Sequence, residues 1–308
     1  MSISAGIGIA DFSFEDAKSF WRWVDLCDNG GVDSIWQSDR IIGTEPTLEC
    51  MSVMAALAGG TEHIKFGMNV ASLGLRDPVI TAKACATIDV LSDGRLLPAF
   101  GIGTALGKDY SARGVPTKGR GKRTDEGLEI MTRLWTEDKV SFEGEFFQLN
   151  EATISPKPVQ KPVPLWIGGV APAAIKRTAK WATGWQAGIE TPEQIKPVVE
   201  AIKIQARELG RTIPEDHYGG GFAFRFGSQD EPIAMEYIRR IEKFMGKAPT
   251  DLQAIGNEQD MLELLLRYKE AGLCKFVLRP IANGGEDMIV QTKLMVEKLL
   301  PLVHGLNN

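Results

Sequence analysis

The side chains that most often do chemistry in enzymes are few in this sequence, and they form no complete catalytic set. Its three histidines, His63, His217 and His304, lie in no HExxH pattern and at no other paired spacing that would bind zinc. No serine lies in a GxSxG turn and no GxxxxGK(S/T) loop is present, so neither an elbow serine nor a P-loop is predicted. The sequence therefore favours a reaction whose chemistry is supplied by a bound cofactor.

One glycine-rich turn has the features of a binding site for the phosphate of such a cofactor. Gly168-Gly169-Val170-Ala171 follows a predicted strand and precedes a predicted helix. Glycines let a ligand approach the backbone closely, and the free N–H groups of a helix N-terminus attract an anion. A plain strand-to-helix turn would contain the same glycines, so both interpretations stay open at this point.

The elements that must position this turn follow a regular alternation. Short apolar runs alternate with segments whose apolar residues recur at helical spacing. About eight strands, each followed by a helix, close a barrel, so we predict an α/β fold, a (β/α)8 TIM barrel, with residues 1–308 as a single domain. The predicted strands are 3–10, 33–37, 64–70, 96–102, 165–168, 184–187, 221–226 and 275–278. The predicted helices are 13–27, capped by Ser13, then 48–58, one after 78, 124–135, 171–182, 192–209, 231–245, 261–268 and 287–302.

Residues 139–163 interrupt the alternation. Residues 140–147 are typical of a hairpin, and four prolines between 156 and 164 enforce extended chain, so we predict an insertion between the fourth helix and the fifth strand. The competing fold is a doubly wound open sheet, whose signature is GxGxxG after the first strand. The only similar stretch, Gly101 and Gly103 with Gly107 one residue too far, follows the fourth strand, which favours the barrel.

Composition limits the possible partners and compartments. Lys and Arg total 35 against 40 Asp and Glu, and no basic run is long enough to follow a phosphate backbone, so nucleic acid is not expected as a partner. Met1–Asp11 lacks the pattern of a signal peptide, and no window approaches the roughly 20 apolar residues of a membrane span, so we expect a cytoplasmic protein without membrane contact. No metal site or disulfide is predicted from the four isolated cysteines, Cys27, Cys50, Cys85 and Cys274.

Seven short stretches occur in an informative order along the first 186 residues. They are GVDSIWQSDR at 31–40, FGMNVASL at 66–73, RDPVITAK at 76–83, ATIDVLSDGR at 86–95, GIGT at 101–104, RGKRTDE at 120–126 and PKPVQKPVPLWIGG at 156–169. Each is weak by itself, but in this order and spacing the chain resembles the luciferase-like monooxygenase superfamily. That superfamily includes FMN-dependent monooxygenases and F420-dependent oxidoreductases.

This resemblance implies that residues at the ends of strands two to five hold the flavin. It places a cis peptide bond at the Asn69–Val70 link, as a bulge under the flavin ring. Thr104 aligns with a cofactor contact, although its hydroxyl would equally cap the loop. Arg120 and Arg123 would reach the phosphate or remain solvated helix cations. The implied cofactor-binding residues are Asp39, Asn69, Val70, Thr104, Arg123, Gly168, Gly169 and Val170.

Arg40 departs from the pattern of the family that the chain resembles. Many relatives have a histidine there, whereas an arginine cannot exchange protons near pH 7. We predict a catalytic role in which Arg40 holds an anionic substrate or the reduced flavin by charge-assisted hydrogen bonds. A structural pair with Asp39 or Glu45 is the alternative. Leu106 stands where F420-dependent sugar-phosphate dehydrogenases have a glutamate acid, which argues against that particular activity.

Residues at other strand ends are predicted to contact the substrate, because catalytic residues of this fold lie there. A core position for Trp36 and an ion pair for either arginine are the alternatives. The predicted substrate-binding residues are Phe12, Trp36, Arg225 and Arg279.

The leading functional hypothesis is a two-component monooxygenase in which reduced FMN and O2 oxygenate a small organic substrate. The chain has no NAD-binding fingerprint, so a separate flavin reductase is expected as a partner. The alternatives are an F420-dependent oxidoreductase that transfers hydride and a non-catalytic flavin-binding protein. Relatives commonly form dimers through the second and third helices, so a homodimer or higher homo-oligomer is expected here. The apolar face of Met51, Met54 and Leu57 would suit contact with a partner, and it would equally suit packing against the barrel.

Overall fold

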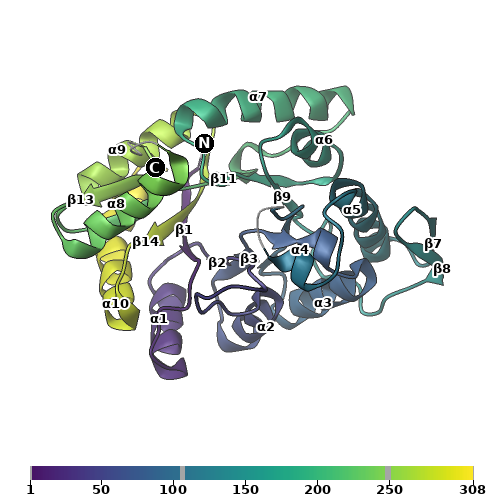
Figure 1. The fold of residues 1–308 in the computed structure, drawn as a ribbon, viewed down its shortest axis with the longest axis horizontal. Helices are drawn as coiled ribbons and strands as arrows, with labels where there is room; N and C mark the ends of the chain where they lie inside the picture. Colours follow the sequence, from purple (N-terminus) through teal and green to yellow (C-terminus); the bar gives the residue numbers. More distant parts are fainter. Residues whose placement is uncertain (1, 105–107, 247–250, 308) are drawn as a thin grey trace.

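Parallel strands form the centre of the molecule and helices surround them (Figure 1). The computed structural model describes residues 2–104, 108–246 and 251–307. The predicted position of Leu106 therefore lies outside the described residues. The strands of the central sheet are β1 (Ser4–Ile9), β2 (Ser34–Gln37), β3 (Lys65–Met68), β4 (Ala71–Ser72), β5 (Leu96–Leu97), β6 (Ala99–Gly101), β9 (Trp166–Gly168), β10 (Gly184–Gln186), β11 (Tyr218–Gly220), β12 (Ala223–Phe226), β13 (Gln253–Gly256) and β14 (Lys275–Pro280).

The parallel pairings close into a ring, which confirms the TIM barrel. The predicted strand 96–102 is broken by Pro98 into β5 and β6. The predicted strand 64–70 corresponds to β3, and the short β4 follows after Asn69 and Val70. β3 pairs with β5, and β4 pairs with β6, so the chain from β3 to β4 runs beside the chain from β5 to β6. From β6 the ring runs through β9, β10, β11, β14, β1 and β2 back to β3.

The seventh strand differs from the prediction. The predicted strand 221–226 corresponds to β12, and the short β11 before it was not predicted; both pair with β14. β13 was not predicted, and it extends the sheet beside β12. Its four residues, Gln253–Gly256, are too few to show a pattern, so only the pairing with β12 identifies it.

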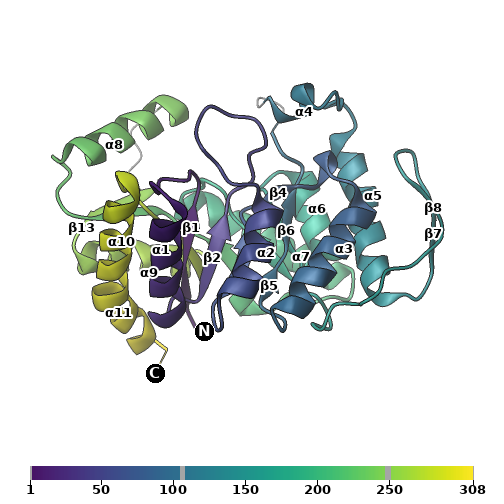
Figure 2. The ribbon, with the colours of Figure 1, turned by 90° about the horizontal axis from the view of Figure 1, so that it is seen from below.

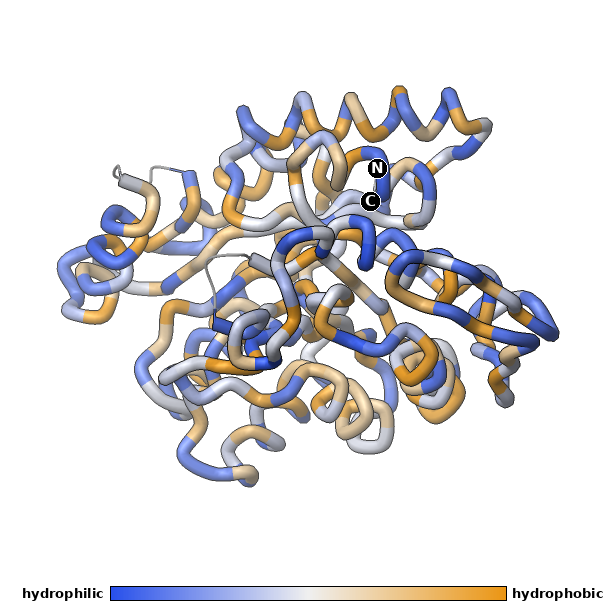
Figure 3. Tube along the Cα trace, turned by 45° about the vertical axis from the view of Figure 1, so that its right-hand side comes forward, coloured by the Kyte–Doolittle hydropathy of each residue, from blue (hydrophilic) through white to orange (hydrophobic). Residues whose placement is uncertain are grey.

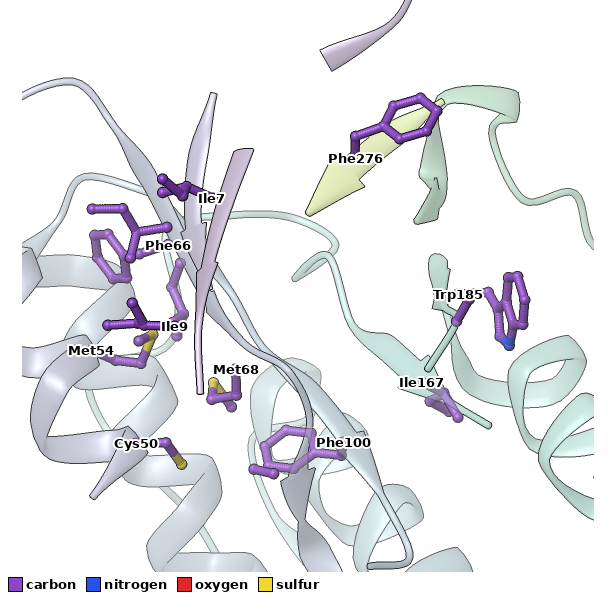
Figure 4. Packing of buried hydrophobic residues seen from close by; sticks show 14 of the residues in the cluster. Ile7, Ile9, Cys50, Met54, Phe66, Met68, Phe100, Ile167, Trp185 and Phe276 are labelled. Atoms are coloured by element: carbon purple, nitrogen blue, oxygen red, sulfur yellow. The ribbon is translucent and has the colours of Figure 1, made fainter. Parts of the chain in front are cut away.

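The strands are buried on both faces, which is why their sequences show apolar runs instead of alternation. Residues of the inner face fill the barrel interior: Trp36, Leu97, Ala99, Trp166 and Val277. Residues of the outer face pack against the helices. Figure 4 shows this outer layer, in which Cys50 and Met54 of the second helix meet strand residues that include Ile9, Phe66, Met68 and Phe100.

The helices begin at caps that the sequence provides. The first helix begins after Asp16, whose carboxylate accepts from the Ser19 N–H at 2.8 Å, while the Ser19 hydroxyl accepts from the Asp16 N–H. The predicted start at Ser13 was wrong, because this capping box lies three residues later. The long helix α7 is amphipathic, as its alternating colours show (Figure 3). The helices are α1 (Ala17–Asn29), α2 (Cys50–Gly60), α3 (Pro78–Leu91), α4 (Asp109–Ala112), α5 (Arg120–Thr136), α6 (Pro172–Trp181), α7 (Pro192–Glu208), α8 (Pro232–Met245), α9 (Glu258–Glu270), α10 (Gly284–Leu294) and α11 (Leu300–Gly305).

The predicted insertion is an antiparallel hairpin between α5 and β9. Its strands are β7 (Val140–Glu143) and β8 (Gln148–Ala152). The Glu126 carboxylate of α5 accepts N–H bonds of 2.9 Å from both Glu145 and Phe146 at the hairpin turn. The buried carboxylate thus fixes the hairpin to the barrel.

The apolar face of α2 named in the sequence analysis turns toward the barrel. Met54 and Leu57 are fully buried within the chain itself, and Met51 is partly buried against the same core. This face is therefore packed against the barrel, and a dimer through α2 would have to use its other face. Among the described residues, no helix combines the length and the apolar character that a membrane crossing requires.

Candidate functional site

A cleft of about 350 Å³ opens at the C-terminal ends of the strands. Figure 2 shows α8, the segment between β2 and α2, and α4 on this same side of the barrel. The cleft wall is formed by the ends of β1 and β14 and by one face of α8, which contributes Ile233, Tyr237 and Ile241. The wall combines apolar side chains with four charged ones, Asp11, Glu236, Arg240 and Arg279.

Asp11 is the charged residue at the end of β1, and the sequence analysis did not identify it. One carboxylate oxygen, Oδ1, is buried in the structure and has no hydrogen-bond partner there. The Nη1 atom of Arg40 lies 3.8 Å from that oxygen. The described residues contain no ion pair of Arg40 with Asp39 or Glu45, so the two structural pairs considered as alternatives are not formed. Its position directly after the first strand was the signal that could have identified Asp11.

Two arginines line the cleft, each from a different element. Arg279 projects from the end of β14 and Arg240 from α8, and neither forms an ion pair with any described residue. Tyr237 of α8 also lines the cleft, and the Arg240 guanidinium lies 5.6 Å from the centre of its ring. Burial raises the pKa of the Tyr237 hydroxyl, and the charges of Arg279 and Arg240 oppose that rise. Two cationic groups beside a phenol form a patch that favours an anionic group.

Val70 occupies the top of the barrel between two glycine-containing strands. The Asn69–Val70 peptide bond is cis, as the resemblance implied. A Cβ atom at Gly101 would lie 2.9 Å from a methyl group of Val70, and a Cβ at Gly168 would lie 3.0 Å from it. Glycine is therefore needed at both positions, because any side chain would overlap Val70. The result is a small apolar platform at the C-terminal end of the barrel.

The predicted phosphate turn lies next to this platform. Gly169 has a φ of +111°, a backbone conformation that L side chains rarely adopt. The helix that follows, α6, begins without a side-chain cap, because its N-cap residue is Ala171. Pro172, the first residue of this ten-residue helix, has no N–H, and the Ala174 N–H donates to the Ala171 carbonyl at 2.8 Å. The Ala173 N–H at this helix start is thus left for an anion, which fits the phosphate of a flavin-type cofactor.

Asp39 lies in a buried network beneath the platform. Its side chain is 2% exposed and accepts 2.8 Å and 2.9 Å bonds from the Arg76 guanidinium and the Ser72 N–H. Because Ser72 lies two residues after Val70, the bond from Asp39 positions β4, the strand that directly follows Val70. The same guanidinium lies 2.9 Å from Glu49, and burial together with the Asp39 charge raises the pKa of the Cys50 thiol.

Asp39, Glu49 and Cys50 are close enough to share a metal ion, since one ligand atom from each lies within 4.8 Å of the others. The Arg76 guanidinium contacts all three of them, at 2.8 Å, 2.9 Å and 3.3 Å. The cation at this cluster is therefore an arginine side chain.

The other predicted residues are placed in different surroundings. Arg123 donates to the Gly74 carbonyl at 3.0 Å and stacks over Phe147, so it braces the start of α5. Thr104 is exposed beyond β6. These two stay predictions as cofactor contacts.

Of the four predicted substrate contacts, Arg279 lines the described cleft. Trp36 is fully buried in the barrel interior, and its indole N–H donates to Ser34 at 2.8 Å, which agrees with the core alternative. Arg225 is bound by Glu231 and Asp287, so it agrees with the ion-pair alternative. Phe12 packs against Phe14 and Phe20 beside Asp11.

Comparison with known proteins adds to this geometry. The sequence profile of a family described as luciferase-like monooxygenase matches residues 3–273. An uncharacterised protein of Mycobacterium tuberculosis is 35% identical over 171 residues, which are 55% of this chain and 58% of that protein. The chain thus matches less than two thirds of that relative's length.

Two further similarities extend over nearly the whole chain. An F420-dependent glucose-6-phosphate dehydrogenase of Amycolatopsis mediterranei is 27% identical over 310 residues, covering 90% of this chain and 91% of that enzyme. The solved structure of an F420-dependent secondary alcohol dehydrogenase in complex with an F420-acetone adduct superposes with a TM-score of 0.85. It is 20% identical and covers 98% of this chain and 99% of its own, which shows a shared fold.

Proposed function

Because this chain belongs to the luciferase-like monooxygenase family, we propose that it is an oxidoreductase that uses F420 or reduced FMN bound above Val70. The fit of the site supports this proposal. The platform formed by Val70, Gly101 and Gly168 offers an apolar contact, and the uncapped start of α6 beside Gly169 offers the Ala173 N–H for a phosphate. When bound, such a cofactor supplies either hydride transfer or the activation of O2.

The geometry favours hydride transfer, and the observation that carries this conclusion is the Asp11 carboxylate. Removing a hydride from an alcohol also requires a group that accepts the hydroxyl proton. The Oδ1 atom of Asp11 is buried without a hydrogen-bond donor, and Asp11 lines the cleft at the end of β1. We therefore assign Asp11 as the proton acceptor, with Arg40 beside it as the counter-charge, and F420 as the cofactor. The Amycolatopsis enzyme, similar over 90% of this chain, is F420-dependent and supports that choice.

Oxygenation with reduced FMN is the second candidate, and the description of the matching family favours it. In this candidate, Arg40 stabilises negative charge on oxygen or on the substrate. A separate reductase would have to supply the reduced FMN.

The cleft also indicates the class of substrate. Its walls include Ile233 and Ile241, and Arg240 and Arg279 are left without ion pairs within the part of the chain that the structure describes. A small molecule with an apolar body and one anionic group would satisfy both features, since an unpaired guanidinium in a cleft binds a carboxylate or phosphate by two parallel hydrogen bonds.

Titration of the purified protein with F420, FMN and reduced FMN, followed by fluorescence and absorbance, tests this proposal. F420 is expected to bind, and a bound F420 reduced by an alcohol substrate would establish hydride transfer. If the protein bound reduced FMN but not F420, and consumed O2, oxygenation with reduced FMN would replace hydride transfer as the function. A protein that binds cofactor but leaves it unaltered with every substrate would be a flavin-binding protein, and binding of none would refute the proposal.

Substituting Gly169 tests the phosphate turn separately. A Gly169→Ala variant is expected to weaken cofactor binding about ten-fold or more, because alanine at a φ of +111° forces the turn to shift and displaces the N–H groups of α6. Gly114→Ala is the matched control: Gly114 also has a positive φ, of +65°, but has open space around it. The dissociation constants of the two variants decide, and an equal affinity in both would place the phosphate elsewhere.

A further inference from the structure

A second cavity lies on the side of the barrel opposite the cleft, between α7 and the segment that precedes β11. Its volume is about 200 Å³. Three cationic side chains line it, Lys203, Arg207 and Arg211, together with one carboxylate, Glu215. Lys203 forms an ion pair with Glu215, so Arg207 and Arg211 give the cavity an excess of positive charge.

The two arginines differ in how they are held. Arg211 donates 2.6 Å and 2.8 Å bonds to the Ala179 and Ala182 carbonyls at the end of α6, which fixes its guanidinium in place. Burial lowers the pKa of Arg211, and no carboxylate opposes this effect. Arg207 donates from Nε to the Lys203 carbonyl at 3.2 Å, and its terminal amino groups bond to none of the described residues. Donors therefore remain available toward the cavity.

The Tyr218 hydroxyl is the second, independent observation. Tyr218 is fully buried at the start of β11 and lines the cavity, yet its hydroxyl has no hydrogen-bond partner in the structure. Buried polar atoms are nearly always paired, because an unpaired one loses its bonds to water without replacement. A ligand with acceptor oxygens in this cavity would supply the missing partner.

From these observations we propose that the cavity between α7 and β11 binds a phosphate group, either as inorganic phosphate or as part of a small phosphorylated metabolite. Two guanidinium groups and a hydroxyl approach from α7, from the 211–213 segment and from β11. A phosphate suits such donors, because its oxygens point in several directions and its charge offsets the two guanidinium groups. This site is separate from the cleft and does not depend on the proposed reaction.

Hydrogen exchange measured by mass spectrometry tests the site, since it reports protection segment by segment. Inorganic phosphate, at constant ionic strength against chloride, is expected to slow exchange in residues 203–218. Glycerol phosphate distinguishes the two sources: protection by inorganic phosphate alone identifies the free ion, and stronger protection by the ester identifies a metabolite. Both outcomes support the site.

Two variants make the test specific. Arg207→Ala and Tyr218→Phe are each expected to raise the phosphate concentration for half-maximal protection about ten-fold, because each removes one donor to a charged ligand. Tyr218→Phe is expected to fold at least as well as the native chain without phosphate, since it removes an unpaired hydroxyl. Lys196→Ala, an exposed lysine of α7 outside the cavity, is the control. No protection in residues 203–218, or protection unchanged in both variants, would overturn the proposal.

Discussion

Replacement of Asp11 by asparagine is expected to lower kcat about 100-fold to 10,000-fold, the range that a lost general base produces. Asparagine keeps the size of the side chain but cannot accept a proton at the oxygen that is now unpaired. Cofactor affinity should stay near that of the native protein, because Asp11 lies at β1 and the phosphate turn lies at β9. Steady-state kinetics with F420 and cofactor titration of the same samples measure both quantities.

Glu236→Gln is the matched control for this experiment. Glu236 also lines the cleft, but it lies on α8 and is exposed to solvent. Its change should alter KM at most slightly and leave kcat intact. If Asp11→Asn retained native kcat, Asp11 would not be the proton acceptor. If Glu236→Gln lost activity instead, that role would belong to the carboxylate of α8.

Asp39→Asn is expected to reduce the free energy of unfolding by about 3 kcal/mol, because it removes one partner of a buried ion pair and leaves the Arg76 charge less compensated. The substitution also weakens the contact to the Ser72 N–H, which holds the strand that follows Val70. Cofactor affinity should therefore fall along with stability. Urea denaturation of the protein without cofactor, followed by titration of the folded variant, separates the two effects.

Glu49→Gln provides the comparison, since Glu49 pairs with the same guanidinium. The Glu49 side chain is 45% exposed, whereas that of Asp39 is 2% exposed. Exposed ion pairs contribute about 1 kcal/mol or less, so this variant should lose no more than that. Similar losses in both variants would show that burial does not distinguish the two carboxylates, and an unchanged stability in Asp39→Asn would refute the positioning role.

The order of elements could be predicted because it depends on local patterns. Apolar runs for strands and helical spacing for helices identified the barrel and the hairpin insertion. Errors occurred where a local signal was ambiguous or short. Ser13 was the predicted cap of the first helix, and only the reciprocal bonds between Asp16 and Ser19 show that the helix begins later.

Residue roles were harder to predict than elements, because the end of a strand holds both inward and outward side chains. Trp36 and Arg279 both lie near strand ends, but the first fills the barrel interior and the second reaches the cleft. Asp11 drew no attention in the sequence, since a single acidic residue after a strand is common. Its unpaired oxygen becomes visible only when α8, β1 and β14 are brought together.

The sequence alone thus determined the barrel and its inserted hairpin, because each follows from residue types at neighbouring positions. Only the tertiary structure decided which charges remain free for chemistry. Asp39 is neutralised by Arg76, 37 residues away, and Arg225 by Asp287, 62 residues away. Asp11, Arg240 and Arg279 instead face a common cleft. Such pairing depends on distances across the fold, which no local pattern of residues encodes.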